Sequence, residues 1–379
     1  MNLQSLSIYH YKRPFEVSFS SSHMKRNCSE SVILLLDFHN GIRGLGECAP
    51  RSYVTGETIA SVYKSITDCY APLLFQSNIE SFADIERVLT ELEKNGCRSY
   101  RDNLSAISCI DLALIDALAH KEHLNIQHFL GAPIRDKAPL SLTIPLISPT
   151  HINDKWHLLQ SWLPVQSVKV VVAGPLSQNI DRVAYIRNVV GSAMDMRIEV
   201  NGQWTYSEAC DNLAHMRGLN ISGIEEPLTA AEQRRLPHLR DRFAIPVILD
   251  ESICTFEDAV NAIENGHCDI INIKISKCGG LINAQKIIRK AAQSGIDCQI
   301  GTHVGESFIL DAAGWHLALA VKNLTYFEGC SFLLHNPSLS ADGISPSRQN
   351  QPHKAGWGLK QRDIRELLSH SELLIRLSP

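Results

Sequence analysis

The chain has 379 residues, of which 44% are hydrophobic and 20% are charged, and its formal net charge is −4. These values are typical of a globular protein and exclude a disordered, collagen-like or coiled-coil chain. The mildly acidic balance argues against a nucleic-acid partner. No apolar run approaches the roughly 20 residues that cross a bilayer, so we expect no membrane association.

The N-terminus and the cysteines predict a reducing compartment. The first residues, MNLQSLSIYHYKRPF, lack the apolar core of a signal peptide. The eleven cysteines include no C-x-x-C pair, and several, such as Cys109 and Cys298, lie in apolar runs. We therefore predict free, buried thiols and a cytoplasmic protein.

Residues 1–135 predict an α+β domain. The segment SVILLLDFHNGIRGLGECA has two apolar stretches joined by a polar HNG turn, which is typical of a β-hairpin. From Glu57 to Leu130 the apolar residues follow a helical period that ends in the apolar segment AISCIDLALIDALAH and a stop at Gly131.

Residues 136–335 alternate between short apolar runs and helical stretches. The runs lie at 140–147, 164–172, 196–200, 222–227, 246–251, 269–275, 297–301 and 324–329. This alternation predicts an α/β fold with a parallel sheet, and eight strands predict a (β/α)8 TIM-type barrel. An open doubly wound sheet is the alternative, but no G-x-G-x-x-G turn follows the first strand. The tail, 336–379, ends in an expected amphipathic helix (RDIRELLSHSELLIRL) and is predicted to pack back on the first domain.

Three successive predicted strands each end in a carboxylate. Glu199, Glu225 and Asp250 are 26 and 25 residues apart, about one βα unit each, so the barrel would bring them to one rim. Three neighbouring carboxylates need a counter-charge. Oxygen ligands favour Mg²⁺, with Mn²⁺ as a substitute, over the alternative that each acid caps a helix.

Lys274 follows on the next strand, in an apolar run, with Lys277 three residues later. Neighbouring positive charges lower the pKa of a lysine, which makes its neutral amine a usable base. A metal that holds a substrate carboxylate would stabilise the enediolate formed when the α-proton leaves. These residues therefore predict removal of an α-proton from a small carboxylate.

These segments together resemble the muconate-lactonizing-enzyme subgroup of the enolase superfamily. The matching segments are GLGECAP, SYVTGET, AISCIDLALIDALAHKEHLNIQHFLG, RIEVNGQWTYSEA, GIEEPL, PVILDES and INIKISKCGGL. The resemblance implies a modified barrel with an α+β capping domain formed by both ends of the chain. It also implies Glu199, Glu225 and Asp250 as Mg²⁺ ligands and Lys274 as the base.

The chain departs from the subgroup in three places. The K-x-K of the second strand is Lys169-Val170-Val171, so the second acid/base position is a valine. The first metal ligand, usually aspartate, is Glu199. The seventh strand leads to GTHVGES, which contains His303 and Glu306. With one lysine left at the α-carbon, elimination or cycloisomerisation is favoured over racemisation.

The candidate site contains further residues in two roles. In a syn elimination, Lys274 would take the proton and His303 would protonate the leaving group; the alternative is that His303 only orients Glu306 or bonds at the rim. Lys169, the first lysine of the motif, is a further candidate catalytic residue. The candidate substrate-binding residues are Asn201, Lys277, Glu306, Arg51, Tyr53 and Glu328, the last as a lone acid where dipeptide epimerases carry D-x-D.

Three functions remain open at this stage. The first is a Mg²⁺-dependent lyase or isomerase that dehydrates or cycloisomerises a small carboxylate. The second is a racemase or epimerase of N-acylamino acids or dipeptides with a non-standard second acid/base. The third is a catalytically retired barrel that binds a ligand. Barrels of this kind often assemble, so we expect a homo-oligomer.

Overall fold

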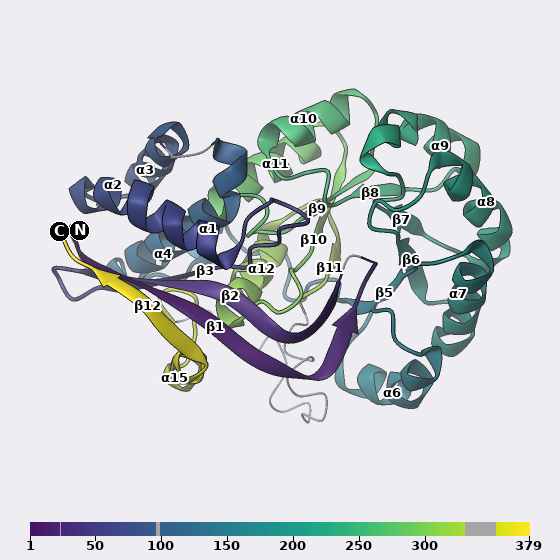
Figure 1. Cartoon of the computed structure of the whole chain (residues 1–379), viewed down its shortest axis with the longest axis horizontal. Coiled ribbons are helices and arrows are strands. Elements are labelled where there is room, and N and C mark those ends of the chain that lie inside the picture. The colour runs from purple at the N-terminus through teal and green to yellow at the C-terminus, as the bar shows by residue number, and fades with distance from the viewer. Residues whose placement is uncertain (23, 96–98, 330–353) are drawn as a thin grey trace.

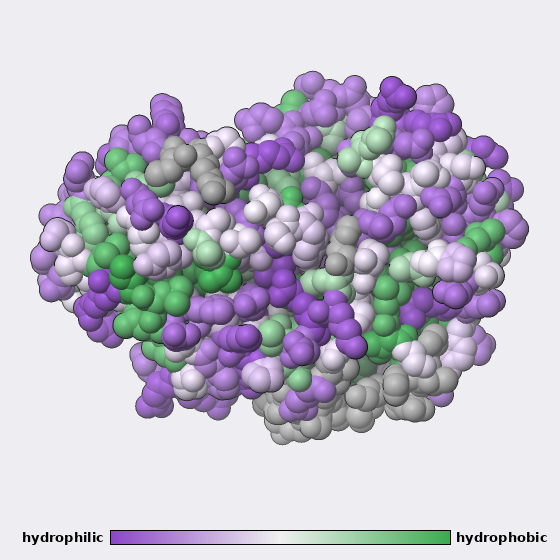
Figure 2. All heavy atoms as spheres, viewed as in Figure 1, coloured by the Kyte–Doolittle hydropathy of each residue, from purple (hydrophilic) through white to green (hydrophobic). Residues whose placement is uncertain are grey.

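The computed structural model describes residues 1–379 except 23, 96–98 and 330–353. It consists of an antiparallel sheet with helices at one end and a barrel at the other (Figure 1). Hydrophilic residues cover much of the face seen in Figure 2.

A four-stranded antiparallel sheet in the order β12-β1-β2-β3 joins the two ends of the chain. Its strands are β1 (Leu3–Ser20), β2 (Lys25–Phe38), β3 (Arg43–Cys48) and β12 (Ser371–Leu377). The predicted hairpin is confirmed, because β2 and β3 pair in register across a turn in which Gly41 has φ +79°.

One part of the tail differs from its prediction. The expected helix is limited to α15 (Gln361–Ser369), and SELLIRL forms β12 instead. Its backbone pairs with β1, for example Ile375 with Ile8. An available sheet edge outweighs the local helical pattern here.

Helices cover one side of this sheet. They are α1 (Ile59–Lys64), the π-helical η1 (Ser65–Tyr70), α2 (Ala71–Gln76), α3 (Phe82–Asn95), η2 (Tyr100–Asn103), α4 (Leu104–Lys121) and α5 (Gln127–Leu130). The stretch Tyr100–Lys121 is long and apolar enough to span a bilayer, contrary to the sequence estimate, but 94% of its most apolar window is buried in the protein. It is a core helix.

Two glycines of the GLGE segment allow α4 to lie directly on β3. A Cβ at Gly44 would stand 2.0 Å from the Ala113 carbonyl oxygen, and one at Gly46 would stand 1.9 Å from that of Cys109. A side chain at either glycine would push β3 and α4 apart.

The second part is a parallel barrel, in the order β11-β10-β9-β8-β7-β6-β5-β4. The strands are β4 (Ser141–Ile144), β5 (Ser167–Val171), β6 (Asp195–Glu199), β7 (Gly223–Glu225), β8 (Val247–Leu249), β9 (Ile270–Ile273), β10 (Asp297–Ile300) and β11 (Leu324–Phe327). A parallel bridge between Leu140 and Phe327 joins the two ends of this sheet. The (β/α)8 prediction is confirmed, and the open-sheet alternative is wrong.

The connecting segments surround the barrel. They are α6 (Pro149–Trp162), α7 (Leu176–Val190), α8 (Tyr206–Met216), η3 (Arg217–Leu219), η4 (Ala230–Arg235), α9 (Leu236–Phe243), α10 (Phe256–Glu264), α11 (Leu281–Gln293) and α12 (Phe308–Ala320). The proposed boundary between residues 335 and 336 lies outside the described residues.

The cysteines differ from the prediction at one position. Cys69 is disulfide-bonded. The free cysteines among the described residues are Cys28, Cys48, Cys109, Cys210, Cys254, Cys268, Cys278 and Cys298, and all but Cys28 are buried. Sequence spacing does not reveal such a bond, because a disulfide depends on the distance between two cysteines in the fold.

Candidate active site at the carboxyl ends of the barrel strands

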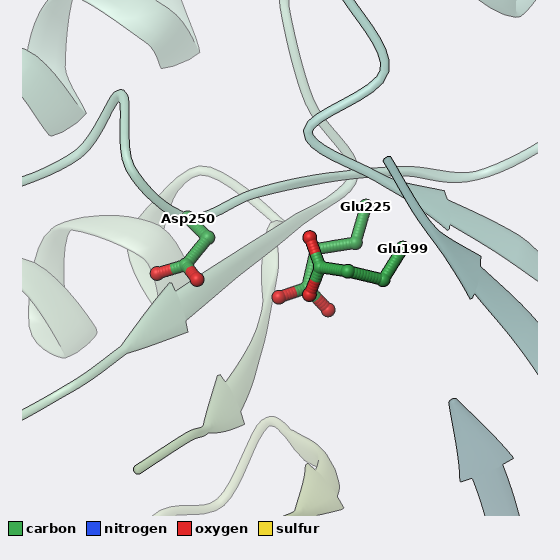
Figure 3. A group of neighbouring side chains, drawn as sticks. All are labelled: Glu199, Glu225 and Asp250. Atoms are coloured by element: carbon green, nitrogen blue, oxygen red, sulfur yellow. The ribbon is translucent and has the colours of Figure 1, made fainter. Parts of the chain in front are cut away.

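Glu199, Glu225 and Asp250 meet at the carboxyl ends of β6, β7 and β8 (Figure 3). One oxygen from each lies within 4.8 Å of the others, and all three side chains are buried. Burial and the charge of Glu225 raise the pKa of Glu199 well above its ordinary value. Such a cluster of hard oxygen donors requires a positive counter-charge.

Three lysines supply positive charge beside the cluster. The Nζ of Lys169 lies 2.9 Å from an oxygen of Glu199 and 2.9 Å from one of Glu225. Lys274 forms an ion pair with Asp250, and the Nζ of Lys277 lies 3.1 Å from the other Asp250 oxygen. Burial acts to raise the pKa of Asp250, but Lys274 and Lys277 outweigh burial and lower it.

The donor set fits a divalent cation such as Mg²⁺. Its members are carboxylates with close oxygens, each supplied by a different strand end. Asn201 fixes the first of them, because its side-chain amide donates to Glu199 Oε1 at 2.9 Å. Glu199, Glu225 and Asp250 would therefore hold the ion.

The site has a lysine on one side and a valine on the other. Lys274 follows β9, whereas Val171 ends β5, four strands away in the order of the eight-stranded barrel. Val171 is two residues from Lys169, whose side chain points into the barrel, so both share the inward face of β5. Among the residues that the structure describes, no lysine lies at the position opposite Lys274.

Glu328 is already paired inside the barrel. Its two oxygens accept hydrogen bonds from Lys169, at 3.0 Å, and from Arg197, at 2.7 Å. The Arg197 guanidinium also lies 3.9 Å from the centre of the Tyr326 ring. Only 7% of Glu328 is exposed. This arrangement makes Glu328 a counter-ion of two buried cations.

Arg197 is a buried site residue that the sequence motifs did not indicate. It lies two residues before Glu199 on β6, so the two-residue period of a strand was the available signal. The same signal applies to Asn272 and Gln299, whose amides donate to Glu225 at 2.8 Å and 3.0 Å. These residues orient the central carboxylate.

Asn201 and Tyr53 lie on the accessible side of the site. They line one cavity together with Glu226, Glu251 and Ser252. Burial and the charge of Asp250 raise the pKa of Glu251 to about 8. The Ser22 hydroxyl, from the segment between β1 and β2, donates to the Asn201 side-chain oxygen at 2.9 Å. A capping-domain segment thus reaches the barrel rim.

Lys277 and Arg51 are held by backbone carbonyls. Lys277 is fully buried and donates to the carbonyls of Asp250, at 2.5 Å, and Asn272, at 2.9 Å. Arg51, 1% exposed, donates to the carbonyls of Pro50, at 2.8 Å, and Val304, at 2.7 Å. Both side chains fix loops around the site, which differs from the direct substrate contact expected from the sequence.

His303 and Glu306 form a buried turn after β10. The backbone N–H of His303 donates to Glu306 Oε1 at 2.6 Å, and burial raises the pKa of Glu306 well above its ordinary value. The Nδ1 of His303 lies 2.9 Å from the Ala49 carbonyl oxygen, which can only accept, so Nδ1 carries the proton.

The protonation of His303 follows from this contact. Burial and the charge of Lys274 hold its pKa well below the ordinary value, so the ring is neutral. Its Nε2 then carries a lone pair, and that atom has no hydrogen-bond partner among the described residues. The arrangement fits an acceptor better than the general acid considered from the sequence.

Comparison with known proteins defines the class. Residues 5–131 match the family "Mandelate racemase / muconate lactonizing enzyme, N-terminal domain", and residues 160–362 match "Enolase C-terminal domain-like". The chain therefore belongs to the mandelate racemase/muconate lactonizing enzyme family, as the sequence motifs predicted, and it is an enolase-superfamily enzyme.

Its relatives include several isomerases. The chain is 28% identical over 358 residues to the L-Ala-D/L-Glu epimerase of Bacillus subtilis, covering 92% of each chain. It is 26% identical over 338 residues to the N-succinyl-L-Arg/Lys racemase of Bacillus cereus, covering 86% of this chain and 87% of the relative.

A solved structure is similar over the full length. The dipeptide epimerase from Cytophaga hutchinsonii, complexed with Mg and the dipeptide D-Ala-L-Val, has a TM-score of 0.84, 25% identity and full coverage of both chains. These relatives support the epimerase alternative better than the elimination or cycloisomerisation that the sequence analysis put first. A catalytically retired barrel finds no support among them.

Proposed function

We propose that this enzyme binds Mg²⁺ and uses Lys274 to remove the α-proton of a small carboxylate, either an N-acylamino acid or a dipeptide. One observation carries the proposal: Lys274 is ion-paired with Asp250 at the rim where Glu199 and Glu225 also converge. The substrate class comes from the relatives, an epimerase and a racemase of such compounds.

The three carboxylates would hold the ion. When bound, Mg²⁺ would offset their negative charge and stabilise the charge that builds on the substrate carboxylate as the α-proton leaves. In the structure, burial acts to lower the pKa of Lys274, but Asp250 and Glu251 outweigh burial and raise it. Neutralising these acids is therefore what frees the Lys274 amine to accept a proton.

The first candidate outcome is epimerisation or racemisation, which the relatives favour. Lys274 would serve one face of the α-carbon. Val171 faces the barrel interior on the opposite strand and has no proton to give, so a two-lysine mechanism does not fit this chain. Water or the substrate itself would have to supply the proton on that face.

The second candidate outcome is a reaction on one face, which Val171 favours. In an elimination, Lys274 would remove the α-proton and, as the ammonium on the same face, return a proton to the leaving β-substituent; in a cycloisomerisation, ring closure would form the enediolate and the Lys274 ammonium would protonate its α-carbon. The neutral His303 offers an acceptor for a substrate N–H or O–H group in either case. It does not offer a proton to a leaving group.

The test is incubation with Mg²⁺ in D2O with a panel of dipeptides and N-succinylamino acids, followed by proton NMR and chiral chromatography. Epimerisation gives α-deuterated product of both configurations. A one-face reaction gives either deuteration with retained configuration or an unsaturated or cyclic product. If none of these compounds gives α-deuteration or a product, the proposed function is contradicted for this substrate class.

A Val171→Lys variant separates the two outcomes. If the wild type exchanges deuterium with retention, a lysine at residue 171 supplies the missing donor and racemised product appears. If the wild type already racemises, the same change leaves the product ratio as it was. A Val170→Lys variant, on the outward face of β5, is unsuitable as a control because Val170 is part of the core; Val171→Ala is the matched change.

A further inference from the structure

We propose that Arg182 is a positioning residue, which holds the ends of β4 and β5 so that residues 20–22 of the capping domain dock at the rim of the candidate active site. Arg182 lies near the start of α7, the helix that follows β5. It acts on backbone groups of the rim. Its effect on catalysis rests on the proposed function, whereas its effect on the rim itself does not.

Three backbone carbonyls at the carboxyl ends of β4 and β5 accept hydrogen bonds from Arg182. Its Nε donates to the Val171 oxygen at 2.8 Å, and its Nη1 donates to the Ile147 oxygen at 2.9 Å. Its Nη2 donates to the Pro145 oxygen. The planar guanidinium presents its donors in a fixed arrangement, so one side chain sets the spacing of these two rim segments.

The charge of Arg182 depends on these carbonyls. Burial lowers the pKa of Arg182 to about 10, and no acid among the described residues offsets this shift. A cation that loses water is stable only if other hydrogen bonds replace that water. The guanidinium and the two rim segments therefore hold one another in place.

The loop after β4 receives the end of β1 between the two carbonyls that Arg182 binds. The Leu146 N–H donates to the Ser20 carbonyl oxygen at 2.8 Å, where the capping sheet meets the barrel (Figure 1). Ser20 is the last residue of β1. A shift of the β4 loop would therefore move this attachment point of the capping sheet.

The same part of the chain has a second attachment at the candidate site. The Ser22 hydroxyl donates to the side-chain oxygen of Asn201, and the Asn201 amide donates to Glu199. The end of β5 is also tied to Glu199, because the Val172 N–H donates to its carbonyl oxygen at 2.9 Å. Residues 20–22 are thus attached to the rim on both sides of β5.

Arg182 should affect substrate binding more than proton transfer. Lys274 follows β9, four strands from β5 in the order of the barrel, and none of its contacts involves the rim segments that Arg182 holds. Loosening residues 20–22 would weaken the cover over one edge of the site and leave the base in place. A change of this kind raises KM with little change in kcat.

Arg187 offers a matched control on the same helix. Its guanidinium also donates only to backbone carbonyls, those of Leu219, Gly191, Met194 and Asn220. These carbonyls precede β6 and β7, so they lie at the amino ends of the strands, away from the candidate site. Losing either arginine removes a similar set of hydrogen bonds, but only Arg182 holds the rim.

Hydrogen–deuterium exchange with mass spectrometry tests the rim without a substrate. We expect peptides that cover residues 16–22 and 140–148 to exchange about tenfold faster in Arg182→Met than in the wild type, because local opening becomes easier. Arg187→Met should leave both peptides at the wild-type rate. Arg182→Lys keeps one donor group and should give a smaller increase; it replaces Arg182→Met if circular dichroism shows that the latter is unfolded.

Kinetics test the effect on the reaction. With a compound that the wild type turns over, Arg182→Met should raise KM about tenfold and keep kcat within about threefold, whereas Arg187→Met should change neither. Unchanged exchange of the two peptides in Arg182→Met, or an equal increase in Arg187→Met, overturns the proposal. A wild type that turns over none of the compounds contradicts the proposed function alone, and the exchange rates then decide the role of Arg182.

Discussion

Glu47 accepts hydrogen bonds from both the backbone N–H and the hydroxyl of Ser307, each at 2.7 Å, although 260 residues separate the two. Glu47 belongs to β3 of the capping sheet, and Ser307 is the N-cap of α12 in the barrel. The Leu310 N–H adds a third bond at 3.0 Å. A buried carboxylate of the capping sheet thus caps the N-terminus of a barrel helix, next to the turn that holds His303 and Glu306.

Replacing Glu47 should destabilise the whole chain. Glu47→Ala leaves three buried donors without an acceptor, each worth about 1–3 kcal/mol, so we expect the free energy of unfolding to fall by about 3 kcal/mol or more. Glu47→Gln keeps one acceptor oxygen and should lose less. Urea denaturation measures both changes.

The matched control is Glu208, which forms an exposed capping box with Thr205 at the start of α8. Glu208→Ala should lose about 1 kcal/mol, as exposed caps do. A Glu47→Ala variant no less stable than Glu208→Ala would contradict the role given to Glu47.

Lys274→Ala should abolish α-proton exchange. General bases contribute about 10²–10⁴-fold to rate, so the exchange rate in D2O should fall within that range or below detection. Lys274→Arg keeps the charge beside Asp250 but cannot become a neutral base, and it should be equally inactive. Exchange at the wild-type rate in Lys274→Arg would show that another group removes the proton.

Mg²⁺ should stabilise the folded chain through the carboxylate cluster. A ligand present at 100 times its Kd adds about 2.7 kcal/mol to the free energy of unfolding, which raises Tm. Asp250→Asn removes one donor and should weaken or abolish the Mg²⁺-dependent shift in differential scanning fluorimetry. Asp258→Asn, whose carboxylate pairs with Arg101 at 2.6 Å, is the control and should keep the shift. Equal shifts in both variants would place the ion elsewhere.

Asp111 should make stability fall as the pH rises. It is buried in α4, and burial raises its pKa from 3.8 to about 7. The folded state therefore keeps this proton between about pH 4 and 7, where the unfolded chain has released it. The stabilisation that this retained proton gives the folded state is complete below about pH 4 and is lost as the pH rises through about 7. This pKa shift corresponds to roughly 4 kcal/mol in the free energy of unfolding.

Asp111→Asn removes that titration. The difference in free energy of unfolding, wild type minus variant, should be more favourable to the wild type at pH 5 than at pH 8. Urea denaturation at both values measures it. A difference that stays constant, or grows with pH, would mean that Asp111 is ionised in the folded chain throughout.

The sequence was sufficient for the fold and for the rim where the carboxylates meet. Eight apolar runs at regular spacing predict the barrel, and a spacing of one βα unit predicts that Glu199, Glu225 and Asp250 converge, since parallel strands end on the same side. Local periodicity failed where a distant strand decided the outcome, as in β12, which pairs with β1 at the other end of the chain.

The roles of single polar residues depended on partners far away in the sequence. Arg51 reaches the carbonyl of Val304, and Glu328 is paired with Lys169 and Arg197. No local pattern distinguishes a side chain that faces a substrate from one that neutralises a buried charge. Arg197, by contrast, was within reach of strand periodicity.

Asp111 and Glu47 accept hydrogen bonds from the N-terminal N–H groups of the barrel helices α11 and α12. The barrel segment therefore depends on carboxylates from the first part of the chain. The Leu281 and Ile282 N–H groups at the start of α11 donate to Asp111, and a Cβ on Gly280 would stand only 2.2 Å from that carboxylate. The barrel segment therefore lacks the acceptors for two of its own helices. Expressed alone, it would expose unpaired helix ends and the surface that β3 and α4 cover, so it would not be an autonomous folding unit.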